Sequence, residues 1–472
     1  MEHKLDHAND IQSVFSSQLE ARSIPVLKKR LNHLSRIENW IKDHHKEIID
    51  VHKQDLGKPD SEVELAEIWY VLSEIKLVRR NIRRWMTNQE KSVSTLALMT
   101  ARSWVHYEPK GVVLIISPWN FPFNLTVGPL VSALAAGNRI MIKPSEMTPN
   151  VSALIEKLVT DLFKPSHVAV FQGDAEVAKS LLQLPFNHIF FTGSPEVGKF
   201  VMSAASKNLA SVTLELGGKT PTIIDETANL DMAVNKIAWG KCINAGQSCI
   251  APDYIFIHQS LKERFIQKLS GKLNEVFGMN SEEKQSSPDY GRIVNNYHWK
   301  RVNHLLETTI REGGTIVYGG GKDEGKNFIE PTVLDKIIPE MKIMKDEIFG
   351  PLLPILSFIS LKECINFINS RPKPLALYIF SNSRKNIDFI IQNTSSGGMV
   401  INEVKSHFLN LNLPFGGVNA SGLGRSHGEA GFQTFSNARA MLKNGRMSMI
   451  GLVFPPYTKW TKKIIRLISR YL

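Results

Sequence analysis

A cysteine in a run of small and polar residues is the first group in this sequence that could carry chemistry. Cys249 follows the segment 244–248 (NAGQS), which predicts a loop or turn. A turn gives the sulfur access to a substrate and supplies backbone N–H donors for a developing negative charge. Cys249 is therefore a candidate nucleophile, and burial as a small core hydrophobe is the alternative. Cys242 and Cys364 fit that alternative.

A carboxylate stands where a predicted strand ends. Glu215 lies in the segment 213–219 (TLELGGK), and the two glycines after it predict an open, ligand-accessible strand end. The alternative is a charge at a strand end that simply faces water.

Two further turns carry polar side chains after apolar strands. Asn120 lies in 118–122 (PWNFP), where its amide could donate to an oxyanion, or it could be present only for its turn preference. Lys143 and Glu146 lie in 143–146 (KPSE), where they could hydrogen-bond ribose hydroxyls, or form a solvated turn.

Glycines and a serine follow another apolar strand. In 191–198 (FTGSPEVG), Gly193, Ser194 and Gly198 lie at the predicted start of a helix, where a pyrophosphate could bind. The pattern is not the full G-x-G-x-x-G fingerprint, so a plain strand-to-helix turn is the alternative. In 347–351 (EIFGP), Glu347 and Phe349 are further candidate site residues. The alternative is that they are only a glutamate and a core aromatic residue that precede a Gly-Pro turn.

Strands and helices alternate along most of the chain, which predicts the elements that position these residues. From Gly111, apolar β-branched runs alternate with helical patterns at βαβ spacing, and a second alternating block runs from Thr213 to about Ser406. This pattern is typical of an α/β fold with doubly wound parallel sheets. We expect two closely packed domains with a cleft between them.

The segments before Gly111 have a different texture. Residues Ile24–Asp55 and Glu62–Trp85 show the spacing of amphipathic helices, and Ser92–Tyr107 predicts a hairpin or arm.

Composition and charge exclude several classes of protein. The 472 residues are 43% hydrophobic and 22% charged, as in a globular protein. Three cysteines exclude a disulfide scaffold and favour a reducing compartment, and the charged N-terminus argues against a signal peptide. The net charge of +12 is concentrated in residues 443–472, which hold seven Lys and Arg and no acidic residue. With neither zinc-finger spacing nor basic-zipper heptads, the sequence does not predict nucleic-acid binding.

Taken together, these motifs resemble the aldehyde dehydrogenase superfamily over nearly the whole chain. The matching segments, in family order, are Pro118–Phe121, Lys143–Glu146, Phe191–Ser194, Glu215–Lys219, Gly246–Cys249, Glu347–Pro351, Leu413–Val418 and Ser421–Gly424. Three more segments resemble the class 3 and fatty aldehyde dehydrogenase branch, namely Ile237–Lys241, Ala251–Tyr254 and Lys373–Tyr378.

The resemblance implies a role for each candidate residue. Cys249 is the nucleophile, Glu215 the general base, and Asn120 forms the oxyanion hole with the Cys249 backbone N–H. The resemblance also implies a set of cofactor-binding residues: Trp119, Lys143, Glu146, Gly193, Ser194, Gly198, Glu347 and Phe349. No metal site is implied.

The implied reaction is oxidation of an apolar aldehyde, aliphatic (including fatty) or aromatic, to a carboxylate through a thiohemiacetal and a thioester. Glu215 favours hydrolysis of the thioester over acyl transfer to coenzyme A. Glu146 can accept hydrogen bonds from a ribose 2′-hydroxyl and should repel a 2′-phosphate, which favours NAD, with NADP as the alternative. Rival hypotheses are a cofactor-independent cysteine esterase or acyltransferase, and a membrane-associated scaffold without catalysis.

The resemblance also implies a domain organisation and a homodimer. Residues 1–90 and 108–214 are expected to bind NAD(P), 215–415 to form the catalytic domain, and 91–107 and 416–446 to bridge subunits.

The tail 447–472 contains a basic amphipathic helix. Beyond Pro455-Pro456, the residues Trp460, Ile464, Leu467, Ile468, Tyr471 and Leu472 share one helix face. The opposite face carries Lys459, Lys462, Lys463, Arg466 and Arg470. The pattern predicts an interfacial helix on an anionic membrane surface, so we expect a cytoplasmic protein that binds peripherally to the membrane. The alternatives are packing on a partner subunit or over the substrate funnel.

Overall fold

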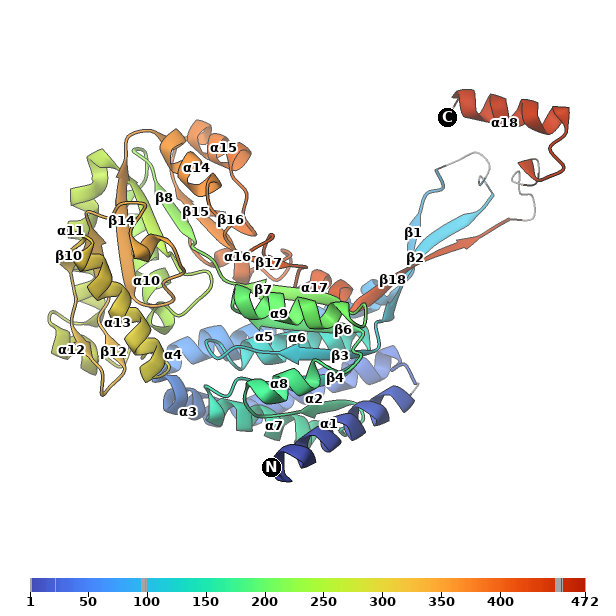
Figure 1. Cartoon of the computed structure of the whole chain (residues 1–472), viewed down its shortest axis with the longest axis horizontal. Helices are drawn as coiled ribbons and strands as arrows, with labels where there is room; N and C mark the ends of the chain where they lie inside the picture. Colours follow the sequence, from blue (N-terminus) through green and yellow to red (C-terminus); the bar gives the residue numbers. More distant parts are fainter. Residues whose placement is uncertain are drawn as a thin grey trace.

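The computed structural model describes residues 2–21, 23–94, 98, 100–445, 451 and 453–471, without the side chains of 2–9 and 471. It contains two lobes, each built on a mainly parallel sheet, and a narrow arm that projects from them and carries the C-terminal helix (Figure 1). This arrangement confirms the predicted α/β class.

The first lobe is built on a six-stranded sheet with the order β17-β7-β6-β3-β4-β5. All neighbouring strands are parallel except β17, which is antiparallel to β7. The strands are β3 (Val112–Ile116), β4 (Arg139–Lys143), β5 (Val168–Val170), β6 (His188–Gly193), β7 (Ser211–Leu216) and β17 (Gly422–Leu423). The alternation that begins at Gly111 predicts this sheet.

Both faces of this sheet are covered by helices. Because side chains alternate along a strand, Val113 and Ile115 of β3 pack on one face, while Val112 and Leu114 pack on the other. The helices that follow the strands are α6 (Asn124–Ala136), α7 (Pro149–Leu162), α8 (Ala175–Leu181), α9 (Pro195–Ser206) and α17 (Gly428–Thr434).

The N-terminal helices complete this lobe. The predicted amphipathic segments form α2 (Leu27–Asp43), α3 (His45–Leu56), α4 (Asp60–Val63), the π-helix η1 (Glu64–Trp69) and α5 (Tyr70–Met86). The first helix, α1 (Glu2–Glu20), was not predicted; it contributes Ile11 and Phe15 to the core beside β3.

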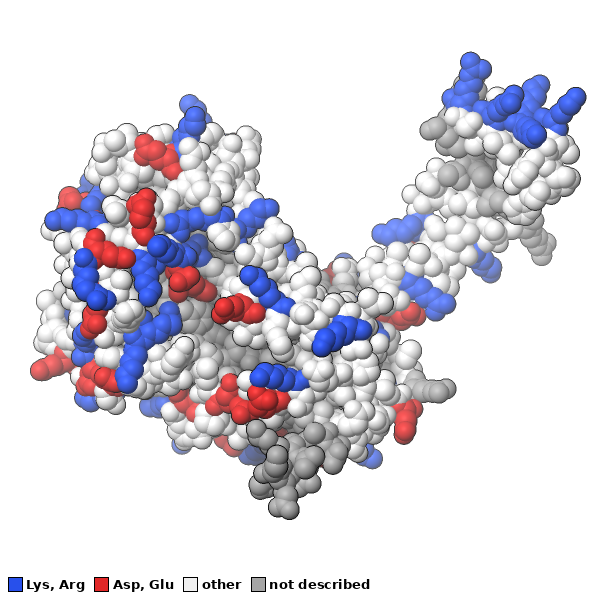
Figure 2. Space-filling view, in the orientation of Figure 1, with Lys and Arg blue, Asp and Glu red and all other residues white. Residues whose placement is uncertain are grey.

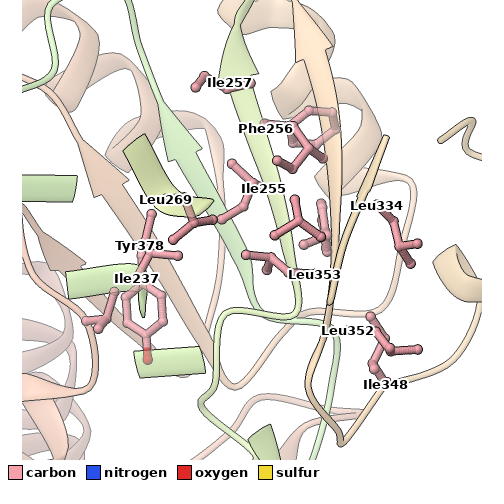
Figure 3. Packing of buried hydrophobic residues seen from close by; sticks show 14 of the residues in the cluster. Ile237, Ile255, Phe256, Ile257, Leu269, Leu334, Ile348, Leu352, Leu353 and Tyr378 are labelled. Atoms are coloured by element: carbon pink, nitrogen blue, oxygen red, sulfur yellow. The ribbon is translucent and has the colours of Figure 1, made fainter. Parts of the chain in front are cut away.

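The second lobe is built on a seven-stranded sheet with the order β10-β13-β14-β9-β8-β15-β16. Its strands are β8 (Pro221–Ile224), β9 (Tyr254–His258), β10 (Thr315–Tyr318), β13 (Thr332–Asp335), β14 (Leu352–Phe358), β15 (Ala376–Phe380) and β16 (Gly398–Ile401). Figure 3 shows part of its core, where Ile255 of β9, Leu353 of β14 and the helical residue Leu269 are buried.

Helices and a short hairpin surround this second sheet. The α-helices are α10 (Leu230–Cys242), α11 (Lys262–Phe277), α12 (Ser281–Ser286), α13 (Asn296–Arg311), α14 (Leu361–Asn369), α15 (Arg384–Asn393) and α16 (Ser406–Leu409). The 3-10 turns are η3 (Ile243–Gly246), η4 (Gln259–Leu261) and η5 (Lys342–Met344), and the hairpin is β11 (Lys322–Asp323) with β12 (Phe328–Ile329).

One expectation about the second block was wrong. Thr213 was expected to open it, but β7 pairs in parallel with β6 and belongs to the first sheet. A boundary between residues 214 and 215 would therefore cut this strand. Alternation along a sequence locates a strand but does not say which sheet it joins, because that depends on pairing with distant residues.

The arm is a three-stranded antiparallel sheet with the order β1-β2-β18. Its strands are β1 (Gln89–Lys91), β2 (Arg102–Pro109) and β18 (Ser436–Lys443). Part of the predicted arm Ser92–Tyr107 thus lies in β2, while residues 95–97 and 99 lie outside the described residues.

The tail forms a helix, as predicted, over α18 (Lys459–Tyr471). It lies away from both lobes at the end of the arm (Figure 1). Leu472 and the side chain of Tyr471 lie outside the described residues. Among the helices described, not one combines the length and apolar character needed to cross a membrane.

Candidate active site

Cys249 lies in a turn that follows α10. The turn η3 contains two residues with positive φ, Asn244 at 53° and Ala245 at 50°, so the chain reverses sharply before the cysteine. Gly246 has a φ of 76°, and a Cβ there would lie 2.4 Å from the Gly350 carbonyl oxygen, so a larger residue does not fit. The turn thus brings Cys249 close to the segment that contains Glu347.

The three cysteines differ in exposure as the sequence predicts. Cys242 and Cys364 are buried, whereas Cys249 keeps part of its surface accessible. Burial, followed by the nearby carboxylates of Glu347 and Glu215, raises the pKa of the Cys249 thiol to about 12. At neutral pH the sulfur is therefore a thiol, and a nucleophilic attack needs a group that removes its proton.

Asn120 is held against the Cys249 turn by hydrogen bonds in both directions. Its Nδ2 donates to the Gln247 carbonyl at 3.1 Å, two residues before the cysteine. Its own backbone carbonyl accepts from Asn244 Nδ2 at 2.8 Å and from the buried Lys58 Nζ at 3.0 Å. The amide that the sequence singles out thus lies beside the candidate nucleophile on a fixed backbone.

Glu215 is buried inside the molecule and does not face water. Its Oε1 accepts a hydrogen bond from Ser426 Oγ at 2.9 Å, while Oε2 has no hydrogen-bond partner among the described residues. Burial raises the pKa of this carboxyl to about 8. Glu215 and Cys249 line the same cavity, so a carboxyl group with one free oxygen shares that cavity with the sulfur.

Glu347 reaches across to the two glycines that follow Glu215. The Gly218 backbone N–H hydrogen-bonds to its carboxylate, and a Cβ at Gly217 would lie only 2.0 Å from its Oε2. Burial and then Asp253 raise the pKa of Glu347 to about 8. The segments 215–219 and 347–351 are thus brought into direct contact.

Aromatic side chains line the same region. The rings of Trp119 and Phe349 meet edge to face with centroids 5.3 Å apart, and His298 lies 4.9 Å from Trp119. Arg301 donates to the backbone carbonyls of Ile348 and Phe349 at 2.7 and 3.0 Å and so holds this segment in place. Sequence reasoning missed His298 and Arg301, since helix α13 carries no motif that marks them.

Ser194 lines a larger cleft of about 700 Å³ together with Gly217, Gly218 and Glu347. Ser194 also caps α9, its Oγ accepting from the Val197 N–H at 3.4 Å. The cleft carries a group of basic side chains, namely Lys199, Lys219, Arg301, Lys342, Lys345, Arg371 and Lys373. Figure 2 shows Lys and Arg side chains gathered on the second lobe beside the hollow between the lobes. The helix N-terminus and these cations favour an anionic ligand such as a pyrophosphate.

Lys143 and Glu146 lie at the carboxyl end of β4 and form an ion pair with each other at 2.7 Å. Lys143 is buried, while the Glu146 side chain is 43% exposed. Gly193 ends β6, and Gly198 lies on α9 against the Leu216 side chain of β7.

The structure therefore separates the predicted residues into groups. Cys249 and Glu215 line one cavity, and Asn120 is hydrogen-bonded to the turn of Cys249. Glu347 lies near the cysteine, and the rings of Phe349 and Trp119 are in contact with each other. Ser194 lines the basic cleft, Lys143 and Glu146 form a pair on the neighbouring strand, and Gly198 packs a helix onto the sheet. The aldehyde dehydrogenase family model matches residues 8–441.

Relatives and solved structures match along almost the whole chain. A 4,4'-diaponeurosporen-aldehyde dehydrogenase of Staphylococcus aureus is 44% identical over 95% of each chain. Aldehyde dehydrogenase family 3 member A2 of Pongo abelii is 42% identical, covering 92% of this chain and 87% of its own. The solved substrate-bound state of AldH from S. aureus matches with a TM-score of 0.92 and 42% identity, covering 97% of this chain and 99% of its own. The chain belongs to the aldehyde dehydrogenase family and resembles its class 3 members.

Proposed function

We propose that this protein oxidises apolar aldehydes to carboxylates with NAD, using Cys249 as a covalent nucleophile. The observation that carries the proposal is the position of Cys249, which lines both the cavity of Glu215 and a second, apolar pocket. The sulfur thus lies between a site for a substrate and a carboxylate that can activate water.

The apolar pocket supports the substrate class. It is a cavity of about 70 Å³ whose wall includes Leu65, Phe121, Trp239, Ile243, Phe408 and Leu409 beside Cys249. Burying a hydrocarbon chain or ring against such a wall stabilises binding by about 25 cal/mol for each Å² of apolar surface removed from water. It makes few hydrogen bonds that would favour a polar substrate.

The residues of the large cleft fit a nicotinamide dinucleotide. The α9 N-terminus and the basic side chains would hold the pyrophosphate, Lys143 and Glu146 the adenosine ribose, and Glu347 and Phe349 the nicotinamide ribose and ring. When bound, the cofactor supplies the hydride acceptor. We assign the cofactor-binding role to the first lobe and the catalytic cysteine to the second. The arm formed by β1, β2 and β18 would bridge two subunits, while residues 422–434, which the bridging segment 416–446 also includes, pack in the first lobe as β17 and α17.

The residues around Cys249 then have defined tasks. The sulfur adds to the carbonyl carbon, and Asn120 Nδ2 with the Cys249 N–H donates to the oxygen of the thiohemiacetal. One such donor typically lowers the barrier by about 3 kcal/mol. After hydride loss, Glu215 takes a proton from water, which hydrolyses the thioester.

A substrate panel with NAD and NADP tests the proposal on the purified chain. Aliphatic and aromatic aldehydes should be oxidised only when a nicotinamide cofactor is present, and Cys249→Ala should abolish turnover. Ester hydrolysis without cofactor, and no aldehyde oxidation with it, would instead favour a cysteine esterase. An inactive chain that still binds membranes would favour a scaffold.

We also propose that α18 binds an anionic membrane surface. Its apolar side chains Trp460, Leu467 and Ile468 are exposed, and Figure 2 shows the basic residues along the opposite side of the helix. Such a helix is stabilised where its apolar face enters a lipid interface and its cations meet anionic headgroups. Binding from the cytoplasmic side agrees with three cysteines that form no disulfide.

Deleting the residues after Pro456 tests the role of the tail. The full chain should pellet with anionic liposomes and the shortened chain should not. If both chains pellet equally, the helix does not bind the membrane. If the deletion instead changes the number of subunits measured by light scattering, the helix packs on a partner subunit.

A further inference from the structure

Lys405 is a buried lysine in a conformation that side chains rarely adopt. It lies between β16 and α16 with a backbone φ of 60° and is only 6% exposed. A left-handed backbone costs free energy for a residue with a Cβ, and burial of an amine costs more. No feature of the local sequence offsets either of these free-energy costs. Contacts with residues from other parts of the fold must therefore hold Lys405 in this conformation.

The amine of Lys405 lines the apolar pocket that also contains the Cys249 sulfur. Its Nζ has no hydrogen-bond partner among the described residues and lies over the Trp239 ring, 5.8 Å from the ring centroid. The rest of the pocket wall is largely apolar. An unpartnered amine is thus enclosed in the chamber where the nucleophile would meet its substrate.

The charged and titratable groups near Lys405 come from several elements. Glu62 approaches from α4, Lys241 and Cys242 from α10, and Cys249 from its turn. The Glu62 carboxylate already accepts a hydrogen bond from the Asn244 N–H at 2.8 Å. Burial lowers the pKa of Lys405 to about 7, so at and above neutral pH much of it is a free amine that can accept a proton.

A hydrogen-bonded tyrosine fixes Lys405 relative to the nucleophile. The Tyr378 hydroxyl accepts from the Lys405 backbone N–H and donates to the carbonyl of Ile250, the residue after Cys249, at 2.6 Å. Tyr378 itself is fully buried in β15, and Figure 3 shows its ring and hydroxyl beside Ile237. The turn of Lys405 and the turn of Cys249 therefore share one rigid link.

From this geometry we propose that Lys405 is the base that accepts the thiol proton of Cys249 when the sulfur adds to the aldehyde. In this step the S–H bond breaks and a C–S bond forms. The carbonyl π electrons move to oxygen, and the proton forms a new N–H bond on Lys405. The inference rests on the proposed function, since it assumes that Cys249 attacks an aldehyde. Glu215 is then left free to activate water later in the cycle.

The pH dependence of Cys249 alkylation by iodoacetamide tests the proposal. The assay needs neither aldehyde nor cofactor, so its failure is distinct from failure of the proposed function. Lys405→Met should raise the apparent pKa of alkylation by about one unit or more, and lower the rate at neutral pH about tenfold. The matched control Lys385→Met, at an exposed lysine of α15, should leave the profile unchanged, and Cys249→Ala identifies the signal.

Two results would overturn the assignment. If Lys405→Met alkylates like the unchanged protein but unfolds at a lower temperature, Lys405 is only the counter-charge of Glu62. If Glu215→Gln slows alkylation and Lys405→Met does not, the carboxylate accepts the thiol proton. Lys405→Gln, which keeps a polar group in the pocket, gives the same readout should the methionine variant fail to fold.

Discussion

At the scale of single residues, the site places several ionisable groups in a poorly solvated cleft. Burial raises the pKa values of Cys249, Glu215 and Glu347 because each loses solvation of its charged form. Cys249 and Glu215 line one cavity, and perturbed groups that share a cavity are typical of catalytic centres. The protonation state of each of these side chains, and not only its residue type, determines when it can take part in the reaction.

Glu215→Gln should stop thioester hydrolysis while leaving the protein folded. We expect kcat to fall about 10²-fold or more, and the acylated enzyme to accumulate in intact-protein mass spectra. In the unchanged protein, turnover limited by this step should rise as pH increases through about 8, where Glu215 ionises. The variant should lose that rise.

The stability of Glu215→Gln provides its control. A carboxyl whose folded pKa is about 8, above its unfolded value, lowers the free energy of unfolding as pH rises between those two values. The glutamine side chain does not ionise, so the variant keeps the free energy of unfolding that the unchanged protein loses as pH rises. It should therefore unfold near pH 8 at a temperature equal to or higher than that of the unchanged protein. A lower unfolding temperature there would show that its inactivity reflects misfolding.

Glu146→Gln should shift cofactor preference toward NADP. The change removes a negative charge and frees the Lys143 ammonium, now paired at 2.7 Å, to meet a 2′-phosphate. We expect the ratio of kcat/KM for NADP to that for NAD to rise about tenfold. Glu176→Gln on α8 is the matched control, and a wild-type preference for NADP would contradict the proposed role of Glu146.

At the scale of elements, a buried ion pair connects the N-terminal helices to the active site. Glu67 in η1 accepts from Lys58 Nζ at 2.6 Å and from the Asn124 N–H at 2.8 Å. Lys58 also holds the Asn120 carbonyl. Although burial alone would raise it, Lys58 and His52 hold the pKa of Glu67 at about 2. The π-helical turn therefore helps to position the oxyanion donor.

Glu67→Ala should lower the free energy of unfolding by about 3–5 kcal/mol, because it leaves Lys58 buried without its partner. In the unchanged protein, the contribution of Glu67 is complete above its unfolded pKa and is lost as pH falls toward about 2. Urea unfolding measures the difference. Glu64 lies in the same π-helix as Glu67 and forms an exposed pair with His45 of α3, so Glu64→Ala should cost less than about 1 kcal/mol.

At the scale of the whole molecule, the arm separates the C-terminal helix from both lobes (Figure 1). Trp460, Leu467 and Ile468 of α18 are exposed, so packing of these side chains against the two lobes does not stabilise the helix.

Replacing Lys462 and Lys463 together with glutamine should weaken binding to anionic liposomes about tenfold or more, since each cation near such a surface contributes about 1 kcal/mol. Raising the salt concentration toward about 1 M should weaken binding of the unchanged protein in the same way. Lys385→Gln is the control in the pelleting assay. Binding that is insensitive to both changes would contradict an electrostatic contribution.

The sequence by itself determined what depends on local pattern. Strand and helix alternation predicts both sheets, the small residues around Cys249 predict its turn, and the spacing of Trp460 and Leu467 predicts the tail helix. Motif order was enough to indicate the family. These features depend on residues within a few positions of each other, where backbone geometry leaves few choices.

Only the tertiary structure decided which distant residues meet. It placed β7 in the first sheet, buried Glu215 against Ser426, and brought Glu347 onto Gly217. It also enclosed Lys405 in the pocket of Cys249, although the sequence around Lys405 carries no motif. Such contacts join residues that lie far apart along the chain, and packing alone determines whether a side chain is buried, partnered or free to react.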